Sequence, residues 1–299
     1  MILKTIIGTA FLLLNVFLVK AQGNPTIKEG AELQLVANGY KFTEGPAADK
    51  EGNVYFTDQP DNTILKWTVA TDSVTVFMDD AGRANGLYFD KEGNLYACAD
   101  EKFELWKISP DKEITVVLDN YKGKNLNGPN DLWIDQKGGV YFTDPYYQRT
   151  YWTRTEPEMK ERRVYYLSPN GKDLKVVADG FVNPNGIIGS YEKNILYISD
   201  IGDKKTYVYQ VSENGDLKNK ELFTSMGSDG MTMDTKGNVY LTGDGVHIFS
   251  KTGKLIGHIA VDRDWTSNVT FGGKDFSTLF ITASDAIFKI VMSTNGMKR

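Results

Sequence analysis

A short segment recurs six times in this chain, and it constrains the fold more than any other feature. Its clearest copy, Asp49-Lys-Glu-Gly-Asn-Val-Tyr-Phe-Thr-Asp58, returns nearly unchanged at residues 90–100, 135–144 and 234–243, and in looser form at 192–200 and 275–282. The aromatic residue near its centre recurs every 40 to 56 residues, as Tyr55, Tyr96, Tyr141, Tyr197, Tyr240 and Phe280. A repeat of this length indicates that one structural unit follows another along the chain.

Each copy begins with a turn and continues as a strand. The Asp-x-x-Gly-Asn segment is rich in turn residues, and the β-branched and aromatic residues after it favour a strand. A third strand pattern follows in every unit and a fourth in most, and helical periodicity is absent from the repeats. The sequence therefore predicts an all-β fold, a six-bladed β-propeller. The strand pattern at Glu32–Val36 has no unit before it, and we expect it to complete the sixth blade and close the ring.

One polar residue stands 11 or 12 residues before the central aromatic of every unit. These column residues are Glu44, Asn85, Asn130, Asn185, Asp229 and Asn268. They fall at the start of the innermost strand of each blade, so a closed ring would bring all six to one mouth of a central channel. Two carboxylates and several amide oxygens suit a hard divalent cation, with Ca²⁺ first and Zn²⁺, Mg²⁺ or Mn²⁺ as alternatives. An Asx-turn that opens the strand explains Asn85 and Asn268 equally well.

The first residues read as an export signal. Lys4 is followed by an apolar run from Ile6 to Val19 and then by Lys20-Ala21, the pattern of a secretory signal peptide. The apolar run is short for a membrane anchor, which is the alternative. We expect an exported protein, periplasmic or secreted, with a signal peptide at residues 1–21 and a single propeller domain at 22–299.

Charge and side-chain chemistry exclude several classes of function. The formal net charge of −5 becomes −7 once Lys4 and Lys20 are removed, which argues against a nucleic-acid-binding surface. After cleavage we expect no membrane association, and the sequence does not fix an oligomeric state. Cys98 is the single cysteine, so it forms no intramolecular disulfide, and its apolar strand pattern predicts a small core residue. His247 and His258 are expected to be packed or exposed rather than ligands.

Two further features belong to the predicted mouth. The second strand ends in an acid in four units, at Asp58, Asp100, Asp144 and Asp200. They could support the site or a second ion, and for Asp58 and Asp100 a turn or surface role is the stronger interpretation. In the third unit this loop expands into an aromatic and basic insertion, residues 145–163. Long loops in compact domains are often functional, so we interpret it as a lid or substrate wall, with a plain surface excursion as the alternative.

The column motifs resemble one known family. Over essentially the whole mature chain, Thr43-Glu44-Gly45-Pro46, Pro129-Asn130-Asp131, Pro184-Asn185-Gly186 and Ser228-Asp229-Gly230-Met231 are similar to the SMP-30/gluconolactonase family of six-bladed propellers with one divalent ion in the channel. The resemblance implies that Glu44, Asn185 and Asp229 coordinate the ion, that Asn130 ligates it or contacts substrate, and that Asp229 is the acid/base. One position departs from the pattern: some members carry an arginine where Gly128 stands here.

The resemblance implies hydrolysis of a small lactone, as in the conversion of a sugar lactone to an aldonic acid. The ion would polarise the carbonyl, and Asp229 would act as general base, although the sequence leaves direct nucleophilic attack open. Because Gly128 offers no side chain, substrate contacts are expected from elsewhere: Arg83, Asn85, Asp131, Tyr146 and Asn268.

Two other functions remain compatible with the sequence. The first is a non-catalytic exported propeller that binds a sugar or peptide and holds a structural calcium ion. The second is a metal-dependent phosphotriesterase or lyase that uses the same site, because one fold can host several chemistries.

Overall fold

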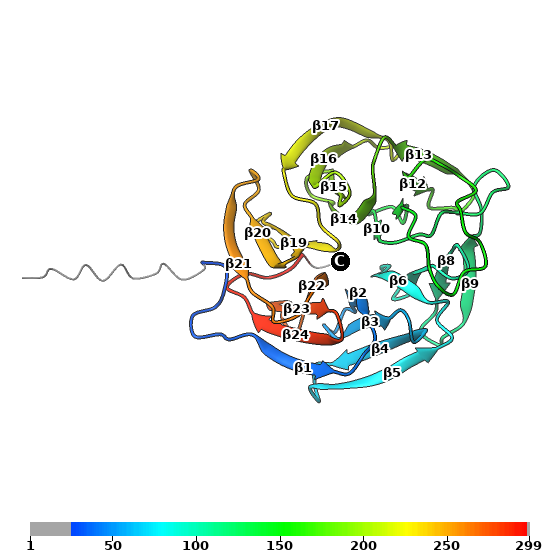
Figure 1. Ribbon diagram of the computed structural model, residues 1–299. Helices are drawn as coiled ribbons and strands as arrows, with labels where there is room; N and C mark the ends of the chain where they lie inside the picture. The colour runs from blue at the N-terminus through cyan, green and yellow to red at the C-terminus, as the bar shows by residue number, and fades with distance from the viewer. Residues whose placement is uncertain (1–24, 298–299) are drawn as a thin grey trace, which may run out of the picture.

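The computed structural model describes residues 25–297, and it shows six four-stranded antiparallel sheets around a central axis (Figure 1). The predicted six-bladed β-propeller is confirmed. The predicted signal peptide lies outside the described residues. Within residues 25–297 there is no helix long and apolar enough to cross a membrane.

Every blade contributes one strand to each of four concentric positions. The innermost strands are β2 (Thr43–Ala48), β6 (Ala84–Phe89), β10 (Leu132–Ile134), β14 (Pro184–Ser190), β18 (Met231–Met233) and β22 (Thr266–Gly272). The second strands are β3 (Val54–Asp58), β7 (Leu95–Ala99), β11 (Val140–Asp144), β15 (Ile195–Asp200), β19 (Val239–Gly243) and β23 (Thr278–Ala283). The third strands are β4 (Thr63–Thr68), β8 (Glu104–Ile108), β12 (Arg163–Leu167), β16 (Lys205–Val211), β20 (Gly245–Phe249) and β24 (Ala286–Val291). The outer strands are β5 (Ser73–Asp79), β9 (Ile114–Leu118), β13 (Leu174–Ala178), β17 (Leu217–Thr224), β21 (Leu255–Ile259) and β1 (Gln34–Asn38).

The ring is closed by β1, which pairs antiparallel with β24 from Gln34 opposite Lys289 to Asn38 opposite Ala286. The N-terminal strand thus completes the sixth blade as predicted, although it begins two residues later than the sequence pattern. This closure joins the two ends of the chain in one sheet, so the edge that the sixth blade would otherwise expose is covered.

The core lies between the blades rather than at one centre. All five residues of β3, Val54 to Asp58, are buried because neighbouring blades cover both faces of the second strand. Cys98 in β7 is also fully buried, and burial raises the pKa of its thiol well above the usual value, as expected for a small core residue. The outer strands instead carry apolar side chains into solvent, with Val76 of β5 at 55% exposure.

The repeated turn is held by its aspartate. In the first unit, Asp49 Oδ1 accepts hydrogen bonds from the backbone N–H of Glu51 and Asn53 at 3.0 and 2.9 Å. Asp234 repeats the arrangement in the fifth unit with Lys236 and Asn238. The predicted turn is therefore an Asp-centred structure that recurs because the same side-chain geometry recurs.

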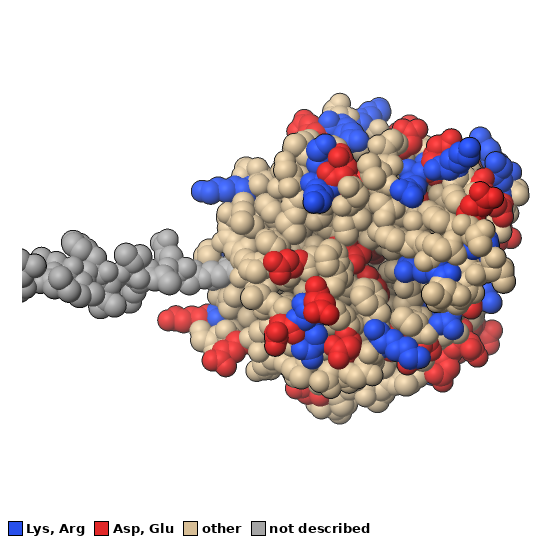
Figure 2. Space-filling view, in the orientation of Figure 1, with Lys and Arg blue, Asp and Glu red and all other residues tan. Residues whose placement is uncertain are grey.

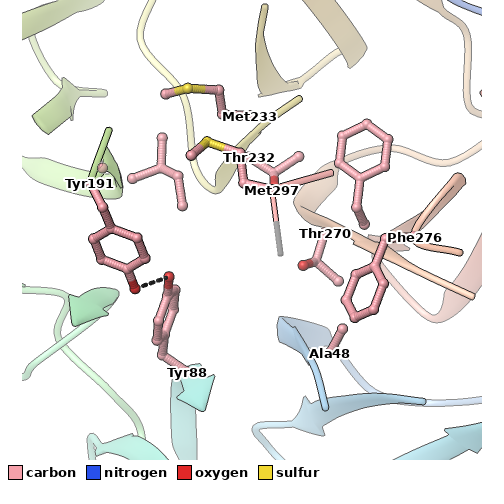
Figure 3. Close-up of a pocket in the computed structure, with 11 residues that line it drawn as sticks. Ala48, Tyr88, Tyr191, Thr232, Met233, Thr270, Phe276 and Met297 are labelled. Atoms are coloured by element: carbon pink, nitrogen blue, oxygen red, sulfur yellow. Dashed lines mark hydrogen bonds between the residues drawn. The ribbon is translucent and has the colours of Figure 1, made fainter. Parts of the chain in front are cut away.

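The C-terminal segment lies against the far end of the channel, opposite the mouth. A cavity of about 40 Å³ there is lined by the ends of innermost strands from five blades, by Tyr191 and Phe276, and by Met297 near the C-terminus (Figure 3). Backbone hydrogen bonds from Thr235 to Asn295 and from Gly296 to Phe276, both 2.8 Å long, hold the C-terminal segment against this end. The cavity has room for only a few water molecules, too little for a substrate.

Candidate functional site

The six column residues lie on the innermost strands or shortly before them, as predicted. Glu44, Asn85, Asn185 and Asn268 belong to strands whose pairing is interrupted at that point by β-bulges. A bulge breaks the regular alternation of side chains and can redirect one of them. Four of the six column residues therefore lie where the innermost strand departs from regular pairing, and Asn130 and Asp229 lie just before theirs.

Glycines after the column residues let neighbouring blades approach closely. A Cβ atom at Gly45 would lie 1.9 Å from the backbone oxygen of Asn85, and Gly45 has a φ of +48°. A Cβ atom at Gly230 would lie 1.9 Å from the Asn268 side chain. Only a residue without a Cβ fits these positions, so the glycines are a requirement of ring closure.

Hydrogen bonds join column residues from adjacent blades. Asn268 Nδ2 donates to Glu44 Oε2 at 3.2 Å, across the point where the sixth blade meets the first. Asn185 Nδ2 donates to Asp229 Oδ1 at 2.8 Å. These bonds place polar side chains from four different blades against one another at the mouth.

The carboxylates of Glu44, Asp131 and Asp229 at the mouth are close enough for the charge of one to raise the pKa of another. Burial, followed by the negative charges of Asp229 and Asp131, raises the pKa of Glu44 well above its usual value. Burial raises the pKa of Asp131 to about 7, and it raises that of Asp229 to about 6 although Trp265 and Asn185 lower it. Burying like charges together is unfavourable unless protons or a cation neutralise them.

The donor atoms suit a hard cation better than a soft one. Glu44 and Asp229 supply carboxylate oxygens, and Asn130 and Asn185 carry amide oxygens at equivalent positions of their blades. In the described part of the chain, no group of three or more His, Cys, Asp and Glu residues could hold a metal by itself. Amide oxygens would therefore have to complete a site, which is a donor set that Ca²⁺ accepts readily.

The predicted substrate-binding residues occupy different surroundings. Asn85 is buried, and Asp131 is buried in the channel wall with Leu132 N–H donating to its Oδ1 at 2.9 Å. Arg83 is bound to Pro60 and Glu101. Their contact with a substrate remains a prediction.

The tyrosine that reaches the column is Tyr147, the neighbour of the predicted Tyr146. Asn185 Nδ2 donates to the Tyr147 hydroxyl at 2.9 Å. Tyr146 instead hydrogen-bonds Gln148 and packs near Trp152. Adjacent residues of an extended chain point in opposite directions, and the sequence did not reveal which of the pair faced inward.

Trp265 is a second residue that the sequence analysis missed. Its indole Nε1 donates to Asp229 Oδ2 at 2.6 Å, while 37% of the residue stays exposed. The sequence does place Trp265 three residues before the column residue Asn268, in the link that enters the sixth blade, and this position near the mouth could have indicated a role in the site. Trp265 and Asn185 together fix both oxygens of Asp229, which is itself only partly buried.

Three of the four acids that end second strands fasten the backbone of their own blade. Asp58 accepts hydrogen bonds from the backbone N–H of Lys41 and Phe42, both at 3.0 Å. Asp144 does the same with Asn127 and Gly128. Asp200 follows with Val182 and Asn183 at 2.8 and 2.7 Å. The turn role expected for Asp58 thus extends to Asp144 and Asp200.

Asp100 differs because its carboxylate binds the insertion of the next blade. Arg149 Nε donates to Asp100 Oδ2 at 3.3 Å, and the Tyr151 hydroxyl also donates to this oxygen. Gly128 lies beneath the contact, where an added Cβ would meet Asp100 Oδ1 at 2.9 Å and Trp152 at 3.0 Å. Asp100 and the insertion therefore fill the space beside Gly128, the position at which some members of the family that the chain resembles carry an arginine.

The two histidines lie opposite each other on the third and outer strands of the fifth blade, not on the innermost strand that carries the column. His247 and His258 pair across β20 and β21, and the Nε2 atom of each lies 2.9 Å from the backbone oxygen of Asp244. Burial, followed by the charge of His258, lowers the pKa of His247.

Comparison with known proteins supplies the family. The model of the SMP-30/gluconolactonase/LRE-like region matches residues 42–285, which include all six column residues. The chain belongs to this family.

Relatives of the family cover most of the chain. A gluconolactonase from Zymomonas mobilis is 31% identical over 88% of this chain and 82% of its own length. Regucalcin from Oryctolagus cuniculus is 24% identical over 79% of this chain and 80% of its own length. The solved structure of a gluconolactonase from Xanthomonas campestris superposes with a TM-score of 0.82 at 27% identity, covering 90% of this chain and 95% of that one.

Proposed function

We propose that this protein is a metal-dependent hydrolase that opens a small lactone at the mouth of the channel. The observation that carries the proposal is Asp229, a partly exposed carboxylate whose two oxygens are oriented by Trp265 and Asn185 and whose charge acts on buried Glu44. Similarity to the gluconolactonase of Zymomonas mobilis supports the choice of a lactone.

Glu44, Asn130, Asn185 and Asp229 would hold a divalent cation, and Ca²⁺ best fits a site made only of carboxylate and amide oxygens. A bound cation would polarise the lactone carbonyl and stabilise the oxyanion that forms on hydrolysis. It would also relieve the repulsion between Glu44 and Asp229 that raises the pKa of Glu44 in the metal-free protein.

Asp229 is the general base of this proposal. Its pKa of about 6 leaves most of it ionised at pH 7, so it can accept a proton from the attacking water. Trp265 and Asn185 hold the carboxylate in one orientation, which lowers the cost of placing it beside the reacting atoms. After ring opening, the same group can return the proton to the alkoxide that leaves.

The open mouth favours catalysis over a purely structural ion. Figure 2 shows acidic side chains within the hollow at the centre of the ring, whereas the cavity at the far end, lined by Met297, is only about 40 Å³. A ligand at the mouth would reach Asp229 directly. We further propose that residues 1–21 direct export, so the substrate would be met in the periplasm or outside the cell.

The test is a hydrolysis screen on metal-stripped protein with Ca²⁺, Zn²⁺, Mg²⁺ or Mn²⁺ added back. The panel contains aldonolactones, unsubstituted γ- and δ-lactones, and a phosphotriester. We expect turnover of lactones that depends on the added ion. Lactone turnover that is equally fast with excess chelator would contradict the role of the ion, and turnover of the phosphotriester alone would replace lactonase with phosphotriesterase.

A further inference from the structure

The insertion between β11 and β12 is fastened to the propeller at several points. Arg154 donates to the backbone oxygens of Leu126 and Asn127, and its guanidinium lies 3.7 Å from the centre of the Phe103 ring and 4.2 Å from that of Trp152. Trp152 is 8% exposed. The stacking of a cation on aromatic rings, together with these partly buried hydrogen bonds, holds the insertion against the propeller as a wall.

Tyr147, in this insertion, places a hydroxyl group beside the column residues. The Tyr147 hydroxyl accepts a hydrogen bond from Asn185, so its own proton is available to another acceptor. A tyrosine hydroxyl is protonated at neutral pH, and it can donate one hydrogen bond while it accepts another. Tyr147 can therefore donate a hydrogen bond close to Asp229.

Arg149 brings a positive charge to the same place. Its guanidinium lies 5.4 Å from the centre of the Tyr147 ring. Nε is used by Asp100, and the terminal nitrogens carry the remaining N–H donors of the fork. The side chain is 23% exposed, whereas that of Asp100 is 3% exposed. In Figure 2, basic side chains border the acidic hollow on the side of blades 2 and 3.

Comparison with the other blades shows that the contact between Asp100 and Arg149 is particular to Asp100. Its counterparts Asp58, Asp144 and Asp200 bind backbone N–H groups of their own blades. Asp100 instead receives Arg149 and Tyr151 from the insertion of blade 3. Asp100 therefore orients an arginine at the mouth instead of binding backbone N–H groups as its equivalents do. We interpret this difference as a sign that Arg149 is held in place to bind a ligand.

We propose that Arg149 and Tyr147 bind the hydroxyl groups of the substrate, with Asp100 as the positioning residue for Arg149, and that the site therefore selects polyhydroxylated lactones over unsubstituted ones. This inference rests on the proposed lactonase function. The pair supplies hydrogen-bond donors at a distance from the carbonyl that is attacked, so it acts on binding and selectivity more than on the chemical step. A site that binds hydroxyl groups discriminates strongly against analogues without them.

The experiment compares glucono-δ-lactone with δ-valerolactone, which has the same ring size and no hydroxyl groups. In the full-length mature protein with Ca²⁺, we expect Arg149→Met to raise KM for the hydroxylated lactone roughly 10- to 100-fold and Tyr147→Phe to raise it about 3- to 10-fold. Neither change should alter KM for δ-valerolactone more than about twofold, and kcat should change little. Asp100→Asn should resemble a milder Arg149→Met.

Asp58→Asn is the matched control, because Asp58 occupies the equivalent position of blade 1 and fastens only backbone. It should lower the melting temperature without changing the ratio of the two KM values. Calorimetric binding of D-gluconate gives a readout without turnover, and the affinity should fall in the same order of variants.

Equal effects on both lactones, or no effect on either, would overturn the inference while leaving lactone hydrolysis intact. Failure of the wild-type protein to hydrolyse any lactone, while it still binds D-gluconate through Arg149, would overturn the proposed function but support the hydroxyl-binding site. Absence of both hydrolysis and binding would overturn both.

Discussion

The two ends of the central channel are built from the same innermost strands, yet they differ in chemistry. At the mouth, Glu44 and Asp229 repel one another and raise the pKa of Glu44. At the far end, Met233 and Met297 lie with Phe276 around a small cavity that the C-terminal segment borders (Figure 3). One end concentrates charge that the fold must tolerate, and the other buries apolar surface that stabilises the fold.

This contrast indicates a division of labour along each innermost strand. Residues at its start are placed by bulges and close glycine contacts, which produce a strained polar site. Residues at its end pack conventionally. Functional sites commonly carry such unfavourable arrangements, which the remaining structure supports. Removing a charged side chain at the mouth should therefore lower activity with little loss of stability, whereas truncating a packed side chain at the far end should lower stability with little loss of activity.

The largest effect is expected from Asp229→Asn. Loss of the general base should lower kcat for the lactone by about 10³-fold, within the range for acid–base catalysis. Because the change also removes a repulsive charge near Glu44, the metal-free variant should melt at the same temperature as the wild type or higher. Full turnover by a folded Asp229→Asn protein would refute the catalytic role.

The next effect concerns Gly45, where ring closure leaves no room for a side chain. Gly45→Ala should cost more than about 3 kcal/mol in the free energy of unfolding, because Cβ would lie 1.9 Å from the Asn85 oxygen and overpacking adds to backbone strain. Gly93→Ala is the matched control: Gly93 also has a positive φ, +88°, but has no atom within 4 Å of the added Cβ. Urea denaturation of both variants makes the comparison, and equal costs would show that crowding at the mouth is unimportant.

A smaller loss of stability, with little change in activity, is expected at the far end. Met297→Ala should lower the free energy of unfolding by about 1–2 kcal/mol, less than for a fully buried methionine, because Met297 is half-buried against the fifth blade. The kcat should stay within about twofold of wild type. Leu255→Ala, at a residue that is 51% exposed, should cost much less. A large loss of activity in Met297→Ala without unfolding would break the division between the two ends.

The smallest effect is the pH dependence of cation binding. Burial raises the pKa of Asp229 to about 6 and that of Asp131 to about 7, above their unfolded values. In the metal-free protein these groups therefore stabilise the fold below about pH 4, and that contribution is lost as pH rises through 6 and 7.

Because Ca²⁺ bound by Asp229 would displace its proton, we expect the affinity for Ca²⁺ to fall as pH is lowered from 8 to 5. The fall is about tenfold per pH unit, and it begins only below the pKa of about 6. The increase in melting temperature on adding Ca²⁺ should accordingly be larger at pH 8 than at pH 5. Calorimetry in buffers of different ionisation enthalpy measures the proton release. An affinity that is independent of pH would show that the carboxylates are already ionised in the metal-free protein.

The sequence by itself determined the blades and the column. The β-branched and aromatic strand segments, the turns that begin with aspartate and the repeat at 40 to 56 residues are local patterns, and stacking is the way in which such units bury their faces. Glu44, Asn130, Asn185 and Asp229 were found because each occupies the same place in its unit. The isolated pattern near Gln34 predicted the closing strand because a sixth blade lacked its fourth member.

The tertiary structure alone decided what surrounds the column. Tyr147 rather than Tyr146 faces Asn185, Trp265 binds Asp229, and Asp100 leaves the role of Asp58 to hold Arg149. These contacts join residues of different blades, and no repeat relates the two partners. Their geometry depends on how the ring closes and how one irregular loop folds over it, which local sequence patterns do not encode.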